Sequence, residues 1–241
     1  MSRRWAYVAV ALPLMAAAGG PHKVVRNTGA LEFSYVWPAQ AVAIPALDLR
    51  FYTEAKRLLT RAQNIALDDQ KIAQQDKRDF HSHFRSVEWA TEGQSVRLLS
   101  LEASIGSFTG GAHPNSSSSA LLWDRRANRE IAVAALFLKP VSFEALTRKS
   151  YCASLDKERL KKREGEKLDG IFSDCPKYAE LAIAPADRNK NGRFETLRFV
   201  AAPYVGGPYV EGEYEVTLPV TSQMIAALRP EFRASFERQR Q

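Results

Sequence analysis

Three of the four histidines in this chain are spaced so that they could bind a metal ion. His81 and His83 are two residues apart, so on a β-strand their side chains would point to the same face. His113, from a neighbouring segment, would complete a set of three imidazoles, the ligand set of a catalytic zinc ion. Such a site would make the protein a metal-dependent periplasmic hydrolase. Because no general base is identified and histidine pairs are common on charged surfaces, this enzyme is the alternative function.

A second candidate metal site begins at Asp187. Asp187, Asn189 and Asn191 place oxygen donors at the first, third and fifth positions of a calcium loop, and a glycine follows. Glu195 falls at the ninth position, but Arg198 occupies the twelfth, where a bidentate glutamate would be expected. Three cationic side chains in the same stretch oppose a cation. The alternative is a polar turn between two strands, and no other cofactor is implied.

Two further groups of residues are candidates for binding a partner. Gly110 and Gly111 precede His113, a pattern that predicts a tight turn with positive φ, fixed by a hydrogen bond from the histidine. Tyr204 and Tyr209 lie among glycine and proline and could be exposed aromatic contacts. The two tyrosines could equally cover a sheet edge, and the sequence leaves these readings open.

In an oxidising compartment, the two cysteines, Cys152 and Cys175, are expected to form a disulfide. An isolated pair in such a compartment normally forms a disulfide, and a loop of this size would stabilise the fold by about 3 kcal/mol. The alternative is a pair of buried thiols. Nothing in the sequence places a basic partner at either thiol to make it a nucleophile.

The N-terminus has the three regions of a secretory signal peptide. Arg3 and Arg4 are followed by an uncharged apolar run, and small residues at 15–19 predict cleavage after Ala18. The apolar run is shorter than the roughly 20 residues that span a bilayer. We therefore expect a periplasmic or secreted protein, with residues 1–18 as signal peptide. A membrane would be contacted only if the signal stayed uncleaved.

Composition and charge fit a folded, exported domain. Hydrophobic residues make up 45% of the chain, enough for a core, and loss of Arg3 and Arg4 lowers the net charge from +7 to +5. The densest basic cluster, at 161–163, is surrounded by glutamates and predicts a solvated helix face. Nucleic acid is therefore not expected as a partner.

Hydrophobic periodicity predicts the elements that must position these residues. Apolar residues from Leu47 to Ile65 recur at steps of three and four and indicate one long helix opened by Pro45. A middle helix is expected at 143–166, and short helices near the C-terminus. Together they predict an α+β fold with an antiparallel sheet. Strands are expected at 31–37, 84–90, 95–108, 120–124, 129–133, 178–184, 194–201 and 213–218.

Four stretches resemble a known family. They are the Gly-Gly-Ala-His turn at 109–115, the strand–turn–strand pattern at 121–137, the Ala-Pro-Tyr segment at 199–209, and the final strand at 212–219. They are similar to the extracytoplasmic domain shared by the lysozyme-sensing anti-sigma factor RsiV and PdaC-type peptidoglycan deacetylases, a DUF3298-like domain. Residues 31–108 resemble its N-terminal companion and 109–241 the RsiV-like part, intimately packed within a single α+β module at 19–241.

The resemblance implies a binding role at the cell envelope and carries no catalytic residue, because deacetylase chemistry belongs to a separate domain. We therefore expect a non-enzymatic module that recognises lysozyme or a cell-wall component. Common lysozymes are basic, so a domain near +5 gains no long-range attraction to them. Anionic envelope polymers match the charge better.

Overall fold

The computed structural model describes residues 20–167, 170 and 172–239, so the predicted signal peptide lies outside the described residues. The larger of two sheets has six strands in the order β1-β2-β3-β4-β5-β6. These strands are β1 (His22–Asn27), β2 (Leu31–Trp37), β3 (His83–Gln94), β4 (Leu98–Phe108), β5 (Asn115–Asp124) and β6 (Arg129–Glu130). The sheet therefore continues past residue 108, where the two parts of the module were expected to meet.

The α+β prediction is confirmed, but the larger sheet is mixed because β2 and β3 pair in parallel. Parallel neighbours need a crossover connection, and here helix α2 (Pro45–Gln75) forms it, preceded by the short α1 (Ala39–Val42). The expectation of a wholly antiparallel sheet is corrected at this one pair. Strand β1, which the sequence analysis did not predict, pairs antiparallel with β2 at the sheet edge. Its residues are mostly exposed, and the adjacent Val24 and Val25 do not give the alternation that marks a half-buried strand.

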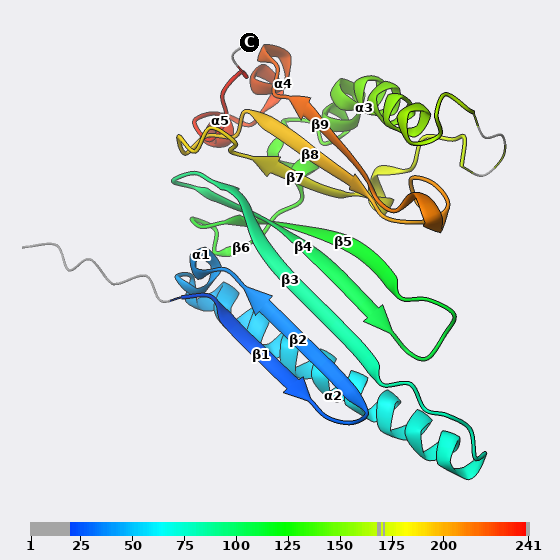
Figure 1. Ribbon diagram of the computed structural model, residues 1–241. Coiled ribbons are helices and arrows are strands. Elements are labelled where there is room, and N and C mark those ends of the chain that lie inside the picture. The colour runs from blue at the N-terminus through cyan, green and yellow to red at the C-terminus, as the bar shows by residue number, and fades with distance from the viewer. Residues whose placement is uncertain (1–19, 168–169, 171, 240–241) are drawn as a thin grey trace, which may run out of the picture.

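Helix α2 packs its apolar stripe against the six-stranded sheet (Figure 1). Leu47, Phe51 and Ala55 are fully buried in one hydrophobic cluster with β2 and β3, and the Phe51 ring contacts Tyr35 and Trp89. Complete burial of a side chain such as Phe51 stabilises the fold by about 1.5–3 kcal/mol. This first hydrophobic core thus joins the long helix to the sheet.

The smaller sheet has three antiparallel strands in the order β7-β8-β9. Helix α3 lies along β9, and Tyr151 and Leu155 of that helix are buried with Phe199 in a second core. The elements of this half are η1 (Val133–Leu136), α3 (Val141–Lys162), η2 (Tyr178–Glu180), β7 (Ala182–Ala186), β8 (Thr196–Ala201), η3 (Tyr209–Glu211), β9 (Tyr214–Pro219), α4 (Ser222–Ala227) and α5 (Pro230–Arg233).

The two sheets pack on each other, with β7 against β3, β4 and β5 (Figure 1). One of the ion pairs that cross the junction runs from Arg198 Nε on β8 to Glu102 Oε2 on β4 at 3.0 Å. The C-terminal segment also reaches the first half, since Ser95 Oγ donates to Ser235 Oγ at 2.9 Å in a buried position. Both contacts join residues that are about a hundred or more positions apart in the sequence.

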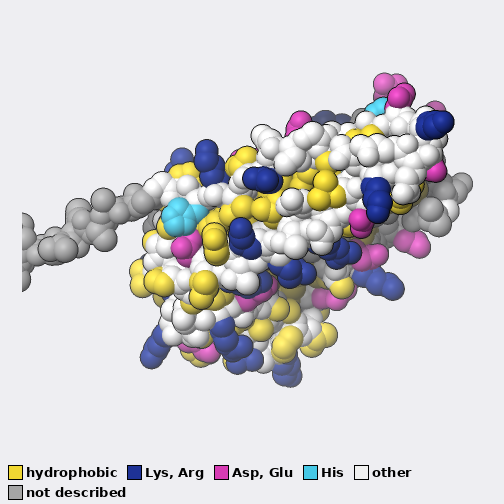
Figure 2. Space-filling view, turned by 90° about the horizontal axis from the view of Figure 1, so that it is seen from below, with side chains coloured by type: hydrophobic (Ala, Val, Ile, Leu, Met, Phe, Trp, Pro, Cys, Tyr) yellow, Lys and Arg dark blue, Asp and Glu magenta, His cyan; other side chains and the backbone are white. Residues whose placement is uncertain are grey.

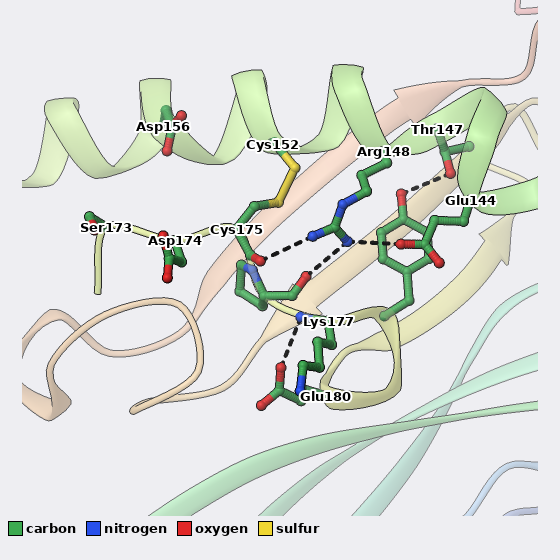
Figure 3. Close-up of a disulfide and its surroundings, with 12 residues drawn as sticks. Glu144, Thr147, Arg148, Cys152, Asp156, Ser173, Asp174, Cys175, Lys177 and Glu180 are labelled. Atoms are coloured by element: carbon green, nitrogen blue, oxygen red, sulfur yellow. Dashed lines mark hydrogen bonds and ion pairs between the residues drawn. A yellow bond between two sulfur atoms is a disulfide. The ribbon is translucent and has the colours of Figure 1, made fainter. Parts of the chain in front are cut away.

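The predicted disulfide is present, between Cys152 of α3 and Cys175 (Figure 3). Beside it, Arg148 donates to the carbonyl oxygen of Cys175 at 3.3 Å and forms an ion pair with Glu144 at 2.9 Å. Together these contacts hold the segment before β7 onto the helix. A structural disulfide of this kind is typical of an oxidising, extracytoplasmic setting.

The described surface carries mixed charge. On the face seen from below, Lys and Arg side chains are spread among hydrophobic and acidic ones rather than forming one continuous stripe (Figure 2). Across residues 20–167, 170 and 172–239, no helix combines the length and apolar character that a bilayer crossing requires.

Candidate binding site

Two loops from different sheets meet at one end of the molecule and bring three aromatic rings together. The loop between β4 and β5 supplies His113, and the loop between β8 and β9 supplies Tyr209 and Tyr204. The ring centroids of His113 and Tyr209 are 3.9 Å apart, and those of Tyr209 and Tyr204 are 5.7 Å apart, both stacked. The Tyr209 hydroxyl donates to the carbonyl oxygen of Pro114 at 2.6 Å. We call these three rings the aromatic stack.

The outer rings of the aromatic stack face solvent. Tyr204 is 56% exposed, and His113 is exposed with its Nδ1 2.9 Å from the Pro114 carbonyl oxygen. Tyr204 also has a φ of 69°, a left-handed conformation that costs a non-glycine residue free energy. Strain of this kind persists only where surrounding contacts hold it. A strained, exposed tyrosine at a loop tip is therefore a candidate contact residue.

Three cations at the C-terminal end of helix α3, the last of them its cap residue Arg163, hold the tyrosine-bearing loop in place. Arg159, only 3% exposed, donates from Nε to the Gly206 carbonyl oxygen at 2.8 Å. Lys162 donates to the carbonyl oxygens of Glu211 and Glu213, both at 2.6 Å. Arg163 binds the Glu211 carboxylate through two nitrogens at 2.8 and 2.9 Å, and this guanidinium lowers the pKa of Glu211. The loop is thus anchored by backbone and carboxylate contacts to one helix.

The prediction of a solvated helix face at 161–163 is therefore wrong for Arg163, whereas Lys162 is exposed as predicted, although both residues bind the loop. Their side chains turn toward the β8–β9 loop, and Arg163 is only 8% exposed. Sequence reasoning missed their role, and that of Arg159, because the acids next to them in the chain seemed to account for their charge. The residue that Arg163 binds, Glu211, lies 48 positions away. Nothing local in the sequence indicates that pairing.

Glycines let the same loop approach the core closely. A Cβ at Gly207 would lie 2.9 Å from the Tyr214 ring and closer still to the Glu211 carboxylate, and one at Gly206 would lie 2.6 Å from the ring. Tyr214 is buried and donates its hydroxyl to Glu211 at 2.5 Å. Burial, and then this carboxylate, raise the pKa of Tyr214 to about 12. Tyr214 therefore stays a neutral donor that fixes the Glu211 side chain.

The predicted tight turn before His113 is confirmed at Gly110, whose φ is 81°. Gly111 does not have a positive φ, and a Cβ there would meet nothing within 4 Å. A requirement for glycine is therefore present at the first of the two positions only.

The three histidines do not converge into the predicted zinc site. His83 is buried and its Nε2 lies 3.2 Å from Asp69 Oδ2, whereas His81 is exposed and His113 belongs to the aromatic stack. Among the described residues, no three His, Cys, Asp or Glu side chains are grouped so that they could hold a metal ion. The geometry therefore gives no support to a metal-dependent hydrolase built on these residues.

The predicted calcium loop lies between β7 and β8, and its four candidate residues come together there. The Asp187 carboxylate accepts hydrogen bonds from the backbone N–H groups of Asn191 at 3.1 Å and Gly192 at 2.9 Å. Glu195 is buried, and its Oε1 accepts from the N–H of Arg188 at 2.8 Å. These bonds form a closed polar turn, which fits the alternative interpretation, and calcium binding stays a prediction.

A C-terminal residue that sequence reasoning did not include also reaches this loop. The Glu237 Oε1 atom accepts from the side-chain amides of Asn189 at 2.8 Å and Asn191 at 2.7 Å. Glu237 is more than 40 positions away in the chain, so spacing alone does not point to it. The loop is therefore fixed to the C-terminal segment as well as to its own strands.

Taken together, these side chains form an exposed aromatic contact surface. The aromatic stack provides apolar ring faces and hydrogen-bonding edges at the rim of two loops. Arg159, Lys162 and Arg163 hold the tyrosine-bearing loop in place.

Comparisons with known proteins place this fold among solved structures. A DUF3298 family protein from Pseudomonas aeruginosa matches with a TM-score of 0.53 and 16% sequence identity, over 87% of this chain and 92% of that chain. A member of the same family from Bacteroides fragilis matches with a TM-score of 0.54 and 14% identity, over 89% of this chain and 95% of that one. No family model and no curated protein matches the sequence. The predicted resemblance is thus confirmed at the level of the fold, which is the fold of DUF3298 family proteins.

Proposed function

We propose that this chain is an exported, non-enzymatic binding module of the cell envelope that contacts a cell-wall polymer through its aromatic stack. The observation that carries the proposal is the exposed, strained Tyr204 stacked with Tyr209 and His113. The disulfide supports an extracytoplasmic location, and the fold shared with DUF3298 family proteins agrees with the sequence resemblance.

The chemistry of the aromatic stack suits a glycan chain. The apolar C–H face of a sugar ring packs against an aromatic ring, while hydroxyl groups on its rim reach the polar edges of tyrosine and histidine. Tyrosine is also enriched where binding energy concentrates at interfaces. The net charge of +5 after loss of the signal favours an anionic polymer through long-range attraction.

The experiment measures co-sedimentation of the purified exported protein with insoluble cell-wall sacculi. We expect saturable binding that falls at least tenfold in Tyr204→Ala and in His113→Ala, because each change removes one ring face from the stack. Tyr52→Ala provides the matched control, since Tyr52 is a similarly exposed tyrosine on α2, away from both loops. If the Tyr204 and His113 variants bound sacculi as well as the wild type does, the proposal would be contradicted.

A calorimetric titration with a common lysozyme tests the other candidate partner. Because both proteins are basic, we expect no saturable heat at physiological salt. One-to-one binding lost in Tyr204→Ala would instead assign the aromatic stack to lysozyme and remove the polymer as its primary partner.

A further inference from the structure

A cavity of about 330 Å³ lies between helix α2 and the ends of three strands, away from the aromatic stack. Its walls come from the middle of α2, the starts of β2 and β3, and the end of β4. Most of the lining is apolar, from Leu31, Leu58, Ala62, Ile65, Phe84 and Phe108. Cavities of this size and character are typical of small-molecule sites.

The apolar stripe of α2 continues into this cavity without being covered. Ile65 is 40% exposed, although it lies one turn beyond residues of the same stripe that pack on the sheet. The helix runs on past the end of the sheet (Figure 1). A hydrophobic wall therefore remains open to solvent at this end of the molecule.

Two arginines stand in the same cavity, Arg61 from α2 and Arg85 from β3. Neither guanidinium group forms a hydrogen bond or an ion pair within the described residues, whereas His83 in the same wall is already paired with Asp69. Arg85 is partly buried, and burial followed by the charge of Arg61 lowers its pKa, with Glu54 opposing this in part. Two unpaired guanidinium groups at an apolar cavity match an anionic group on an apolar ligand.

We propose that this cavity binds an amphiphile with a single acyl chain and an anionic head, and that a fatty-acid carboxylate is its ligand. The chain lies along Leu58, Ala62 and Ile65, and the carboxylate accepts hydrogen bonds from Arg61 and Arg85. This goes beyond the polymer-binding role, because no residue of the aromatic stack takes part.

The test is a calorimetric titration of the exported protein with decanoate below its micelle concentration, with decanol and decyltrimethylammonium as ligands of altered head group. We expect saturable one-to-one binding of decanoate and at least tenfold weaker binding of the other two. The double variant Arg61→Gln/Arg85→Gln should lose decanoate binding at least tenfold. The variant Arg26→Gln/Arg57→Gln is the matched control, since it makes the same charge change at exposed positions outside the cavity.

A second variant keeps both charges and fills the cavity. Ala62→Phe should abolish decanoate binding while circular dichroism shows a folded protein. Equal binding of decanol and decanoate, or equal losses in the two double variants, would overturn the proposal. Binding to anionic phospholipid vesicles without binding of decanoate would assign the arginines to a membrane surface and overturn it as well. Tyr204→Ala should leave decanoate binding unchanged, so failure of this site is distinguishable from failure of the aromatic stack.

Discussion

At the scale of single residues, Gly207 shows how closely the tyrosine-bearing loop packs. Gly207→Ala would press a Cβ against the Glu211 carboxylate and the Tyr214 ring, and the loop would have to move away from α3. We expect a loss of about 1–3 kcal/mol in the free energy of unfolding, the usual cost of overpacking. Urea denaturation measures this change. Gly111→Ala, where a Cβ meets nothing within 4 Å, should change stability by less than about 0.5 kcal/mol.

Asp187 offers a second prediction at this scale, because its carboxylate accepts two backbone N–H groups within its own loop. Asp187→Ala removes this acceptor, while the Asn191 N–H keeps its hydrogen bond to Asn189 Oδ1, and we expect a loss of about 0.5–1.5 kcal/mol in the free energy of unfolding. Urea denaturation in the presence of EDTA measures this loss without any metal contribution. A variant as stable as the wild type in EDTA, but less stable in millimolar calcium, would assign the carboxylate to a metal ion instead.

The residues of the aromatic stack could be predicted individually but not as a group. Glycine and proline around Tyr204 and Tyr209 indicate an exposed loop, and Gly110 indicates a turn before His113. The stacking itself depends on the packing of two loops that are about 90 positions apart in the chain. Arg159 and Arg163, which hold one of these loops, gave no local signal of that role, because the loop carbonyl and carboxylate that they bind lie 47 and 48 positions away.

At the scale of elements, the junction between the sheets carries a buried carboxyl group. Burial raises the pKa of Glu102 on β4 to about 7, with the charge of Arg198 opposing the rise. In the unfolded chain the pKa would be near 4.5. The folded state therefore binds the proton more tightly between these values, and we expect stability to fall by about 1–3 kcal/mol as pH rises from 4.5 to 7.

Urea denaturation across this pH range checks the expected slope. Glu102→Gln should flatten it, since the amide does not titrate. Glu215→Gln should retain it, because Glu215 also pairs with Arg198 but is half exposed. Identical pH profiles for the wild type and Glu102→Gln would show that Glu102 does not carry the effect.

The local sequence pattern predicted where helices and strands lie better than it predicted which strands pair. The stripe from Leu47 to Ile65 located the long helix, because burial on one side imposes a period of 3.6 residues on the sequence. Strand β1 was missed because an exposed edge strand needs no apolar alternation. The parallel pairing of β2 and β3 was missed because register across a helical crossover depends on tertiary packing, whereas hairpin turns mark their own pairing.

At the scale of the whole molecule, the distribution of tryptophan allows the two halves to be observed separately. Trp37, Trp89 and Trp123 all belong to the core of the six-stranded sheet, and the core of the three-stranded sheet contains none. Tryptophan fluorescence of the described residues therefore reports on the half that contains the six-stranded sheet. Far-ultraviolet circular dichroism reports on both. The Glu102–Arg198 and Ser95–Ser235 contacts predict that the halves unfold together.

Removal of the disulfide tests this coupling, because Cys152 and Cys175 both lie in the tryptophan-free half. Replacing both cysteines by alanine should lower the free energy of unfolding by about 2–4 kcal/mol, since the unfolded chain is no longer constrained. If the halves form one cooperative unit, tryptophan fluorescence and circular dichroism will show the same lowered urea midpoint. If the fluorescence midpoint stayed at its wild-type value while circular dichroism became biphasic, the halves would be independent domains. The buried contacts across the junction lead us to expect the first result, because separating the sheets would leave Glu102 and Arg198 without each other.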